Sequence, residues 1–111
     1  MCIFCKIINN EMPSSKVYED KNYLAFKDIN PKAPIHILII PKQHIEYLSE
    51  IDDSNKHIIG DMAIIANKLA KELGIDKSGY RILINNGEDA GQEVFHIHMH
   101  LLGGKKMKFS V

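Results

Sequence analysis

Three histidines alternate with apolar residues near the C-terminal end of the chain, at His96, His98 and His100. In a strand, every second side chain faces the same side, so this spacing predicts three imidazoles on one face and Ile97 and Met99 in the core. Side chains two apart on a strand lie roughly 6–7 Å from one another, so the imidazoles are expected to surround one volume. Three groups that titrate near neutrality would cost stability if they charged together, which favours a functional role.

Two chemistries suit three clustered imidazoles. One is a catalytic zinc ion held by three ring nitrogens, with a fourth position open for water. The other is attack by one neutral imidazole, while its neighbours orient it and stabilise charge. The preceding loop favours the second, because backbone N–H groups at the glycine turn around Gly91 are expected to bind phosphate oxygens. We therefore interpret His98 as a nucleophile that attacks phosphorus.

A second group of metal-binding residue types lies at the start of the chain, where Cys2 and Cys5 form a C-x-x-C pair. Such a pair is found in disulfides, in redox motifs and as half of a metal site. A thioredoxin-like redox site normally follows a strand, and only Met1 precedes this pair. The position therefore favours half of a metal site.

The composition predicts one small soluble domain. The chain has 111 residues, a formal net charge of +0 and 45% hydrophobic residues. The absence of net charge argues against a protein that coats nucleic acid, although it allows one small phosphorylated ligand. The longest nearly apolar run, 35–41, is too short to cross a membrane, and no secretory signal is visible. We therefore expect a cytoplasmic protein that interacts with neither nucleic acid nor membranes.

Hydrophobic periodicity predicts an α+β fold, with a mostly antiparallel sheet of about five strands, one long helix and a short N-terminal helix. The expected strands are 16–18, 22–27, 35–40, 80–84 and 94–102, and the short helix is 3–9. The long helix is expected over 54–73, where an apolar stripe recurs every three or four residues. Asp52, Asp53 or Ser54 are expected to cap its start, and Gly74 to end it in a left-handed conformation.

The triplet and its surroundings resemble the histidine triad (HIT) family. Residues 96–102 match the family's alternating histidine signature, and the likeness extends over 26–31, 33–44 and 85–104. Residues 91–95 before the triplet, and Gly103 and Gly104 after it, are most similar to the Hint branch. The resemblance implies one HIT domain over 1–111. It also implies a homodimer that binds purine nucleotides such as AMP or GMP.

The resemblance implies a nucleotidyl hydrolase or transferase of the phosphoramidase type. His98 would attack the α-phosphorus of nucleoside phosphoramidates and related adenylates, and water would then release the nucleoside monophosphate from the histidine. His100 would contact phosphate oxygens with His36 behind it, and the His96 carbonyl would orient His98. The residues that the resemblance assigns to nucleotide binding, besides His98 and His100, are Phe4, Ile7, Phe26, Asp28, Ile29, Asn85, Gly91, Gln92, Glu93 and Val94.

Relatives with an N-terminal C-x-x-C imply a structural zinc ion, here on Cys2, Cys5, His44 and His96, and no catalytic cofactor. A Cys2His2 set fills all four positions around zinc, so it would leave His98 free. His57 has no such context and is expected to be a solvated helix residue.

Three other functions stay open from the sequence. One is hydrolysis of dinucleoside polyphosphates, and another is a nucleotide-binding regulatory module whose hydrolysis is incidental. The third is a metal-dependent hydrolase that uses the three triplet histidines as ligands. The short C-terminal tail at 105–111 departs from longer relatives, so the leaving group is undetermined.

Overall fold

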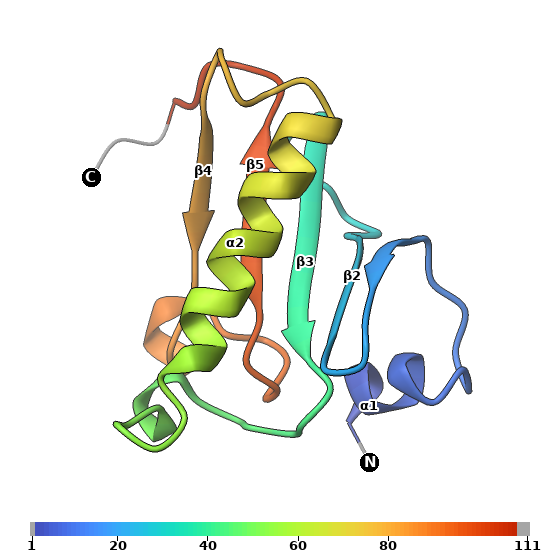
Figure 1. The fold of residues 1–111 in the computed structure, drawn as a ribbon, viewed down its shortest axis with the longest axis vertical. Coiled ribbons are helices and arrows are strands. Elements are labelled where there is room, and N and C mark those ends of the chain that lie inside the picture. The colour runs from blue at the N-terminus through green and yellow to red at the C-terminus, as the bar shows by residue number, and fades with distance from the viewer. Residues whose placement is uncertain (1, 109–111) are drawn as a thin grey trace.

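Five strands form a single antiparallel sheet in the order β1-β2-β3-β5-β4 in the computed structural model, which describes residues 2–108 (Figure 1). The strands are β1 (Lys16–Glu19), β2 (Tyr23–Lys27), β3 (Ile35–Pro41), β4 (Tyr80–Leu83) and β5 (Met99–Gly103). β3 pairs with both β2 and β5, so this β-branched strand lies inside the sheet and is almost fully buried. The predicted α+β class is confirmed.

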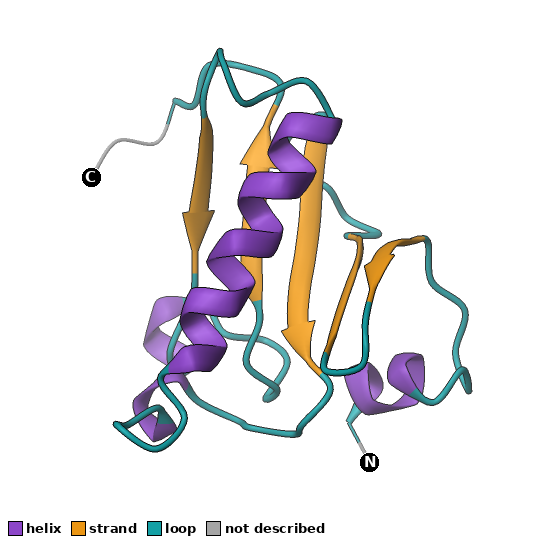
Figure 2. Cartoon of the chain, viewed as in Figure 1, coloured by secondary structure: helices purple, strands orange, loops and turns teal. Residues whose placement is uncertain are grey.

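The two α-helices, α1 (Ile3–Ile8) and α2 (His57–Glu72), lie on different faces of the sheet (Figure 2). The apolar stripe of α2 packs on the face that carries Ile37, Ile39 and Leu101. Phe4 and Ile7 of α1 pack on the other face, against Leu24, Phe26, Leu38 and Ile40. The second face is therefore only partly covered, and that is where the histidines lie. Short 3-10 helices cover Leu48–Glu50 and Glu88–Ala90.

The start of α2 differs from the prediction. The helix begins at His57, Lys56 occupies the cap position, and no side chain caps it. Asp52 instead accepts hydrogen bonds from the backbone N–H and the hydroxyl of Ser54, which holds these residues in a turn. Such side-chain bonds compete with helix formation. The other end agrees with the prediction, because Gly74 has φ 75° and the Ile75 N–H donates to Ala70 O.

The last strand is shorter than predicted, because residues 94–98 are not part of β5. The ladder with β3 runs from Ile35↔Gly103 to Ile39↔Met99. Before that point the Ile97 N–H donates to Ile45 O in the segment after β3, which takes the chain out of the sheet. Ile97, Met99 and Leu101 are nevertheless buried in the core as the alternation predicts. The predicted strand conformation of residues 94–98 was wrong, whereas the prediction that Ile97, Met99 and Leu101 face the core was right.

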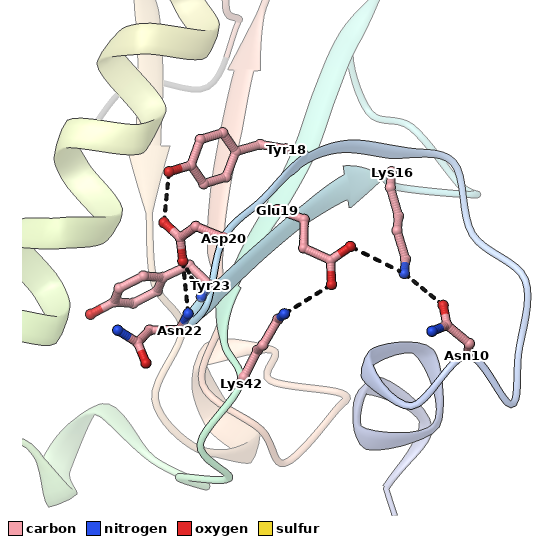
Figure 3. A network of polar contacts seen from close by, with 8 residues as sticks. All are labelled: Asn10, Lys16, Tyr18, Glu19, Asp20, Asn22, Tyr23 and Lys42. Atoms are coloured by element: carbon pink, nitrogen blue, oxygen red, sulfur yellow. Dashed lines mark hydrogen bonds and ion pairs between the residues drawn. The ribbon is translucent and has the colours of Figure 1, made fainter.

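The first hairpin is fixed by its own polar side chains. Asp20 accepts hydrogen bonds from the backbone N–H groups of Asn22 and Tyr23, both at 2.8 Å, and from the hydroxyl of Tyr18 at 2.6 Å (Figure 3). Glu19 forms an ion pair with Lys42, at the end of β3, at 2.9 Å. These contacts set the turn that carries the chain back into β2, whose end forms part of the site.

In the part of the chain that the structure describes, no helix has the length and apolar character needed to span a membrane.

Candidate active site

A cavity of about 270 Å³ lies on the sheet face opposite α2, between α1, the end of β2 and the histidine segment. His98 and His100 line it from one side, and Phe4, Ile7 and Phe26 line it from another. The three apolar residues are buried, with exposed fractions of 5%, 7% and 4%. Apolar walls opposite two imidazoles suit a ligand with one flat, apolar part and one anionic part. The other lining residues are Ile3, Met12, Pro13, Ser14, Lys27, Asp28, Ile29, Asn30, Leu38, Gly91, Glu93 and Val94.

His98 is held in one tautomer. Its Nδ1 lies 2.8 Å from the backbone carbonyl oxygen of His96, and a carbonyl only accepts hydrogen bonds. Nδ1 therefore carries the proton, and Nε2 of the neutral ring has a free electron pair. The edge-to-face contact with Phe4, with ring centroids 5.1 Å apart, restricts the ring further. A buried, oriented imidazole of this kind is suited to nucleophilic attack.

His100 is held in the complementary tautomer. The backbone N–H of Lys32 donates to Nδ1 of His36 at 3.0 Å, so Nε2 of a neutral His36 carries the proton. That nitrogen lies 2.9 Å from Nδ1 of His100, which must then accept. Nε2 of His100 is consequently an N–H donor, and it is buried without a partner among the described residues. An unpartnered donor at a cavity wall indicates that a ligand atom accepts its bond.

Burial keeps these imidazoles neutral. It lowers the pKa of His98 below its usual range, and it lowers the pKa of His100 to about 4 with the added effect of His98 and His36. Burial also lowers the pKa of His36, although Asp28 acts in the opposite direction. The 3.4 Å contact between His36 Nε2 and Asp28 Oδ2 is therefore a weak hydrogen bond between a neutral ring and a carboxylate. Neutral imidazoles retain the electron pair that a nucleophile needs.

His96 does not share the volume of the other two, contrary to the prediction of a common face. Its ring is fully buried, with its centroid 6.0 Å from that of Phe4, and its Nδ1 is 3.5 Å from the Cys2 sulfur and 3.1 Å from Nδ1 of His44. The reason is that β5 begins only at Met99, so the side chains of residues 94–98 do not follow the strict alternation of a strand. His96 reaches the cavity only through its carbonyl, which orients His98.

Four residues from three distant segments form a metal-binding set, Cys2, Cys5, His44 and His96. The two sulfurs are 3.1 Å apart, the two Nδ1 atoms are 3.1 Å apart, and the sulfur–nitrogen distances run from 3.3 to 3.7 Å. A tetrahedron around zinc requires about 3.4–3.8 Å between ligand atoms. The sulfur–nitrogen distances therefore agree with a closed, four-coordinate zinc site, whereas the two sulfurs and the two nitrogens lie closer together than a bound zinc ion would hold them.

The surroundings of this set prepare it for a cation. His96 Nε2 donates to the Pro41 carbonyl at 2.8 Å, which leaves the electron pair of Nδ1 directed at the cysteines. Burial and the neighbouring Cys2 thiol raise the pKa of the Cys5 thiol, so a bound metal has to displace its proton. These four residues would hold the ion, and it would tie α1 to the histidine segment.

Two residues that the resemblance assigns to nucleotide binding do not line the cavity. Gln92 is buried, with its amide donating to Glu46 O and Val94 O and accepting from the Gly87 N–H. Its side chain therefore holds the loop in shape. Asn85, two residues past β4, is also outside the lining. The backbone N–H groups of Gly91 and Gln92 donate within the loop, so Glu93 and Val94 are its candidate donors to a phosphate.

Ser14 is a lining residue that the sequence did not single out. Its hydroxyl is buried and has no hydrogen-bond partner among the described residues, a property it shares with His100 Nε2. Nothing in the local sequence marks it, because a serine after a proline is typical of any turn. Asp28 and Ile29 lie at the same wall, and Ile29 is 89% exposed. His57 is exposed, as predicted.

Known proteins are similar to this chain in sequence. The HIT domain family matches residues 9–107. A HIT-like protein of Buchnera aphidicola subsp. Baizongia pistaciae is 53% identical, over 96% of this chain and 97% of its own. The purine nucleoside phosphoramidase of Escherichia coli (strain K12) is 47% identical, over 95% and 88%.

A solved structure has the same fold. The HIT family hydrolase from Clostridium thermocellum superimposes with a TM-score of 0.96 at 54% identity, covering 99% of this chain and 96% of that one. The match includes the histidine segment and the sheet that positions it. The chain therefore belongs to the histidine triad (HIT) family.

Proposed function

We propose that this protein is a nucleotide hydrolase that cleaves nucleoside 5′-phosphoramidates and related adenylates at the α-phosphorus and releases AMP or GMP. The observation that carries the proposal is the pair of complementary tautomers at the cavity. His98 presents an electron pair on Nε2, and His100 presents an N–H on Nε2, with ring centroids 5.0 Å apart. A nucleophile beside a donor for phosphate oxygen is the arrangement that attack on phosphorus requires.

The reaction has two steps. His98 Nε2 attacks the α-phosphorus, the P–N bond to the leaving amine breaks, and the amine takes up one proton from the solvent to leave neutral. Nδ1 of His98 keeps its proton against the His96 carbonyl throughout. Water then attacks the same phosphorus, the bond to His98 breaks, and one proton of the water returns to the solvent, which restores the neutral imidazole and yields the nucleoside monophosphate. His100 donates to a phosphate oxygen as negative charge develops in each step.

The rest of the cavity suits a nucleoside. Phe4, Ile7 and Phe26 form a buried apolar wall on which a base would stack, with the Phe4 and Phe26 rings themselves edge to face at 5.4 Å. Asp28 is half-buried at the same wall and would accept hydrogen bonds from the ribose hydroxyls. The backbone N–H groups of Glu93 and Val94 would reach the phosphate from the loop. The Glu93 carboxylate is exposed, so it need not approach the anion.

We also propose that Cys2, Cys5, His44 and His96 hold one structural zinc ion. When bound, zinc supplies four bonds that close the N-terminal segment onto the 94–98 segment. Phe4 lies between the two cysteines and Ile7 lies two residues after Cys5, so the bound ion would also fix these two side chains at the cavity. No step of the proposed reaction uses this ion.

The exposed side of the sheet supports the proposed homodimer of single-domain subunits. Within residues 2–108, β4 is an edge strand that pairs only with β5. Ile82 on β4 is 41% exposed. A self-complementary contact through this edge would cover this apolar side chain. Light scattering coupled to size exclusion measures the mass and tests the dimer directly.

Hydrolysis of adenosine 5′-phosphoramidate in water labelled with oxygen-18 tests the proposed function. We expect AMP that carries one labelled oxygen, because water enters at phosphorus in the second step. Diadenosine polyphosphates run in parallel test the nearest rival substrate class, and faster turnover of those would transfer the assignment to them. Tight AMP binding without label incorporation would instead indicate a regulatory nucleotide-binding module.

A further inference from the structure

The Ser14 hydroxyl is a polar group at the candidate active site that the proposed reaction does not use. It is buried and has no hydrogen-bond partner within residues 2–108, and the same is true of Nε2 of His100. Both residues line the same cavity. The proposed reaction supplies a phosphate oxygen to His100, whereas Ser14 is left without a partner. A buried polar group of this kind at a cavity wall indicates a contact with the ligand.

The strand register places Ser14 beside Asp28. The pairing of β1 with β2 continues beyond the two strands, because the Lys27 N–H donates to Ser15 O at 3.0 Å. One residue further along this register, Ser14 lies opposite Asp28. Residues directly opposite in an antiparallel pair face the same side, with Cβ atoms about 4.5–5.5 Å apart. Both residues line the cavity, which agrees with a shared face.

The two neighbouring side chains do not bond to each other. Asp28 Oδ1 accepts from the Asn30 backbone N–H at 2.8 Å, and Oδ2 lies 3.4 Å from Nε2 of His36. Each carboxylate oxygen has two lone pairs, so Asp28 retains the capacity to accept further hydrogen bonds. The Ser14 hydroxyl is free both to donate and to accept. A single ligand group between these side chains could therefore bond to both.

The chemistry of the two side chains restricts what that group is. It must donate to the Asp28 carboxylate and accept from the Ser14 hydroxyl, and an alcohol does both through one oxygen. An unprotonated ring nitrogen of a base only accepts, and an amino group of a base only donates. A phosphate oxygen would bring a second negative charge to the carboxylate. Within a nucleotide, the ribose hydroxyls are the groups that fit.

We propose that the Ser14 hydroxyl donates to the oxygen of a ribose hydroxyl, and that the same ribose hydroxyl donates to Asp28. Ser14 is thereby a specificity-determining residue that selects ribonucleotides over deoxyribonucleotides. This inference rests on the proposed nucleotide hydrolase and specifies the sugar of its substrate. Ser14 is partly exposed, and rotation about its one side-chain torsion turns the hydroxyl toward the ligand. A deoxyribose would leave both side chains without this partner.

Titration calorimetry with AMP, 2′-deoxy-AMP and 3′-deoxy-AMP tests this inference. The dissociation constants are measured for the wild type, for Ser14→Ala and for the control Ser15→Ala, whose side chain is exposed and outside the cavity lining. Thermal unfolding verifies that each variant is folded. Comparing the ligands within each protein separates a lost contact from a general change in the cavity, because a general change weakens all three nucleotides alike.

We expect the wild type to bind AMP about tenfold or more tightly than the deoxynucleotide that lacks the contacted hydroxyl. In Ser14→Ala the affinity for AMP should fall by about threefold to tenfold, and the affinity for that deoxynucleotide should not fall. The deoxynucleotide that behaves in this way identifies the 2′ or the 3′ hydroxyl, and Ser15→Ala should match the wild type.

An equal loss for all three nucleotides in Ser14→Ala, or no loss for any of them, overturns the inference and leaves the proposed function intact. The expected pattern of affinities in a protein that cleaves no phosphoramidate supports the ribose contact and overturns the proposed reaction alone. Failure of the wild type to bind AMP overturns both.

Discussion

The His36 Nε2 atom lies 2.9 Å from Nδ1 of His100, and this contact decides which nitrogen of His100 faces the candidate active site. The direction of the hydrogen bond follows from the backbone N–H of Lys32, which donates to the other nitrogen of His36 at 3.0 Å. The Lys32 backbone N–H therefore determines the tautomer of His36, and His36 in turn determines that Nε2 of His100 carries a proton. That N–H would donate to a phosphate oxygen.

Replacing His36 should impair turnover without removing the nucleophile. In His36→Leu, nothing donates to Nδ1 of His100, so its ring is free to adopt the tautomer that turns an electron pair toward the phosphate. We expect kcat/KM to fall by roughly 10–100-fold, the usual scale for partners that orient a functional histidine. Nitrogen-15 NMR of His100 reports the tautomer directly.

The matched variant for this test is His36→Gln, whose amide offers a donor and an acceptor. It should retain more activity and more of the original tautomer than His36→Leu. Equal activity and an unchanged His100 tautomer in His36→Leu would show that the His36 contact does not orient the ring.

Removal of zinc should destabilise the protein and loosen nucleotide binding. We expect one zinc ion per chain in the purified wild type and almost none in Cys5→Ser. A loss of roughly 2 kcal/mol in the free energy of unfolding would lower the melting temperature by about 10 °C. AMP binding should weaken as well, because α1 carries Phe4 and Ile7.

The control for the zinc test is His57→Ala, since His57 is exposed and outside the metal-binding set. Calorimetric unfolding and metal analysis of both variants suffice. Zinc content and melting temperature in Cys5→Ser equal to those of His57→Ala would rule out the proposed metal site.

Folding stability should fall between pH 6.5 and pH 4 in the metal-free protein. The pKa of His100 is about 4 in the folded chain and close to 6.5 when unfolded, so the unfolded state binds more protons in this range. The contribution of the neutral His100 to the free energy of unfolding is therefore complete above pH 6.5 and is lost as the pH falls toward 4. His100 alone would contribute at most about 3 kcal/mol, since one pH unit corresponds to 1.36 kcal/mol per proton.

Urea unfolding at pH 7 and pH 5 measures this slope, with His100→Gln as the informative variant and His57→Gln as its control. The slope should be shallower in His100→Gln and unchanged in His57→Gln. An identical slope in all three proteins would contradict the burial of a neutral His100.

Ser14→Ala should separate folding from binding. Removing a buried hydroxyl that has no partner leaves the unliganded protein equally stable or more stable, by up to about 1 kcal/mol. If bound nucleotide supplies the missing partner, affinity for AMP falls severalfold in the same variant. The neighbouring exposed Ser15→Ala is the control, and titration calorimetry with thermal unfolding measures both quantities. Lower stability together with unchanged affinity would assign Ser14 a structural role.

Much of the fold could be predicted from local patterns. The stripe of α2 and the alternation of 97–101 identify inward-facing residues, because burial of apolar side chains dominates at those positions. The residue at which β5 begins could not be predicted from such local patterns. It depends on a hydrogen bond from Ile97 to Ile45, two residues far apart in the sequence.

The site could be predicted only in part, because it too depends on contacts between residues far apart in the sequence. Residue types and spacing single out His96, His98 and His100, yet they cannot show that His96 turns toward Cys2 and Cys5 while its carbonyl serves His98. Ser14 and the Lys32 backbone N–H carry no local signal, since their importance comes from the residues that the fold places against them.

Single-turnover cleavage of an adenosine 5′-phosphoramidate with a fluorescent amine tests the central claim most directly. Wild type and His98→Ala are compared, each with and without a chelator. We expect release by the wild type even in chelator, and a loss of several orders of magnitude, about 10⁴-fold or more, in His98→Ala. Mass spectrometry of the quenched wild type should find the adenylyl group on His98. Equal rates in the two proteins would contradict a histidine nucleophile, and the mechanism proposed for this protein would fail.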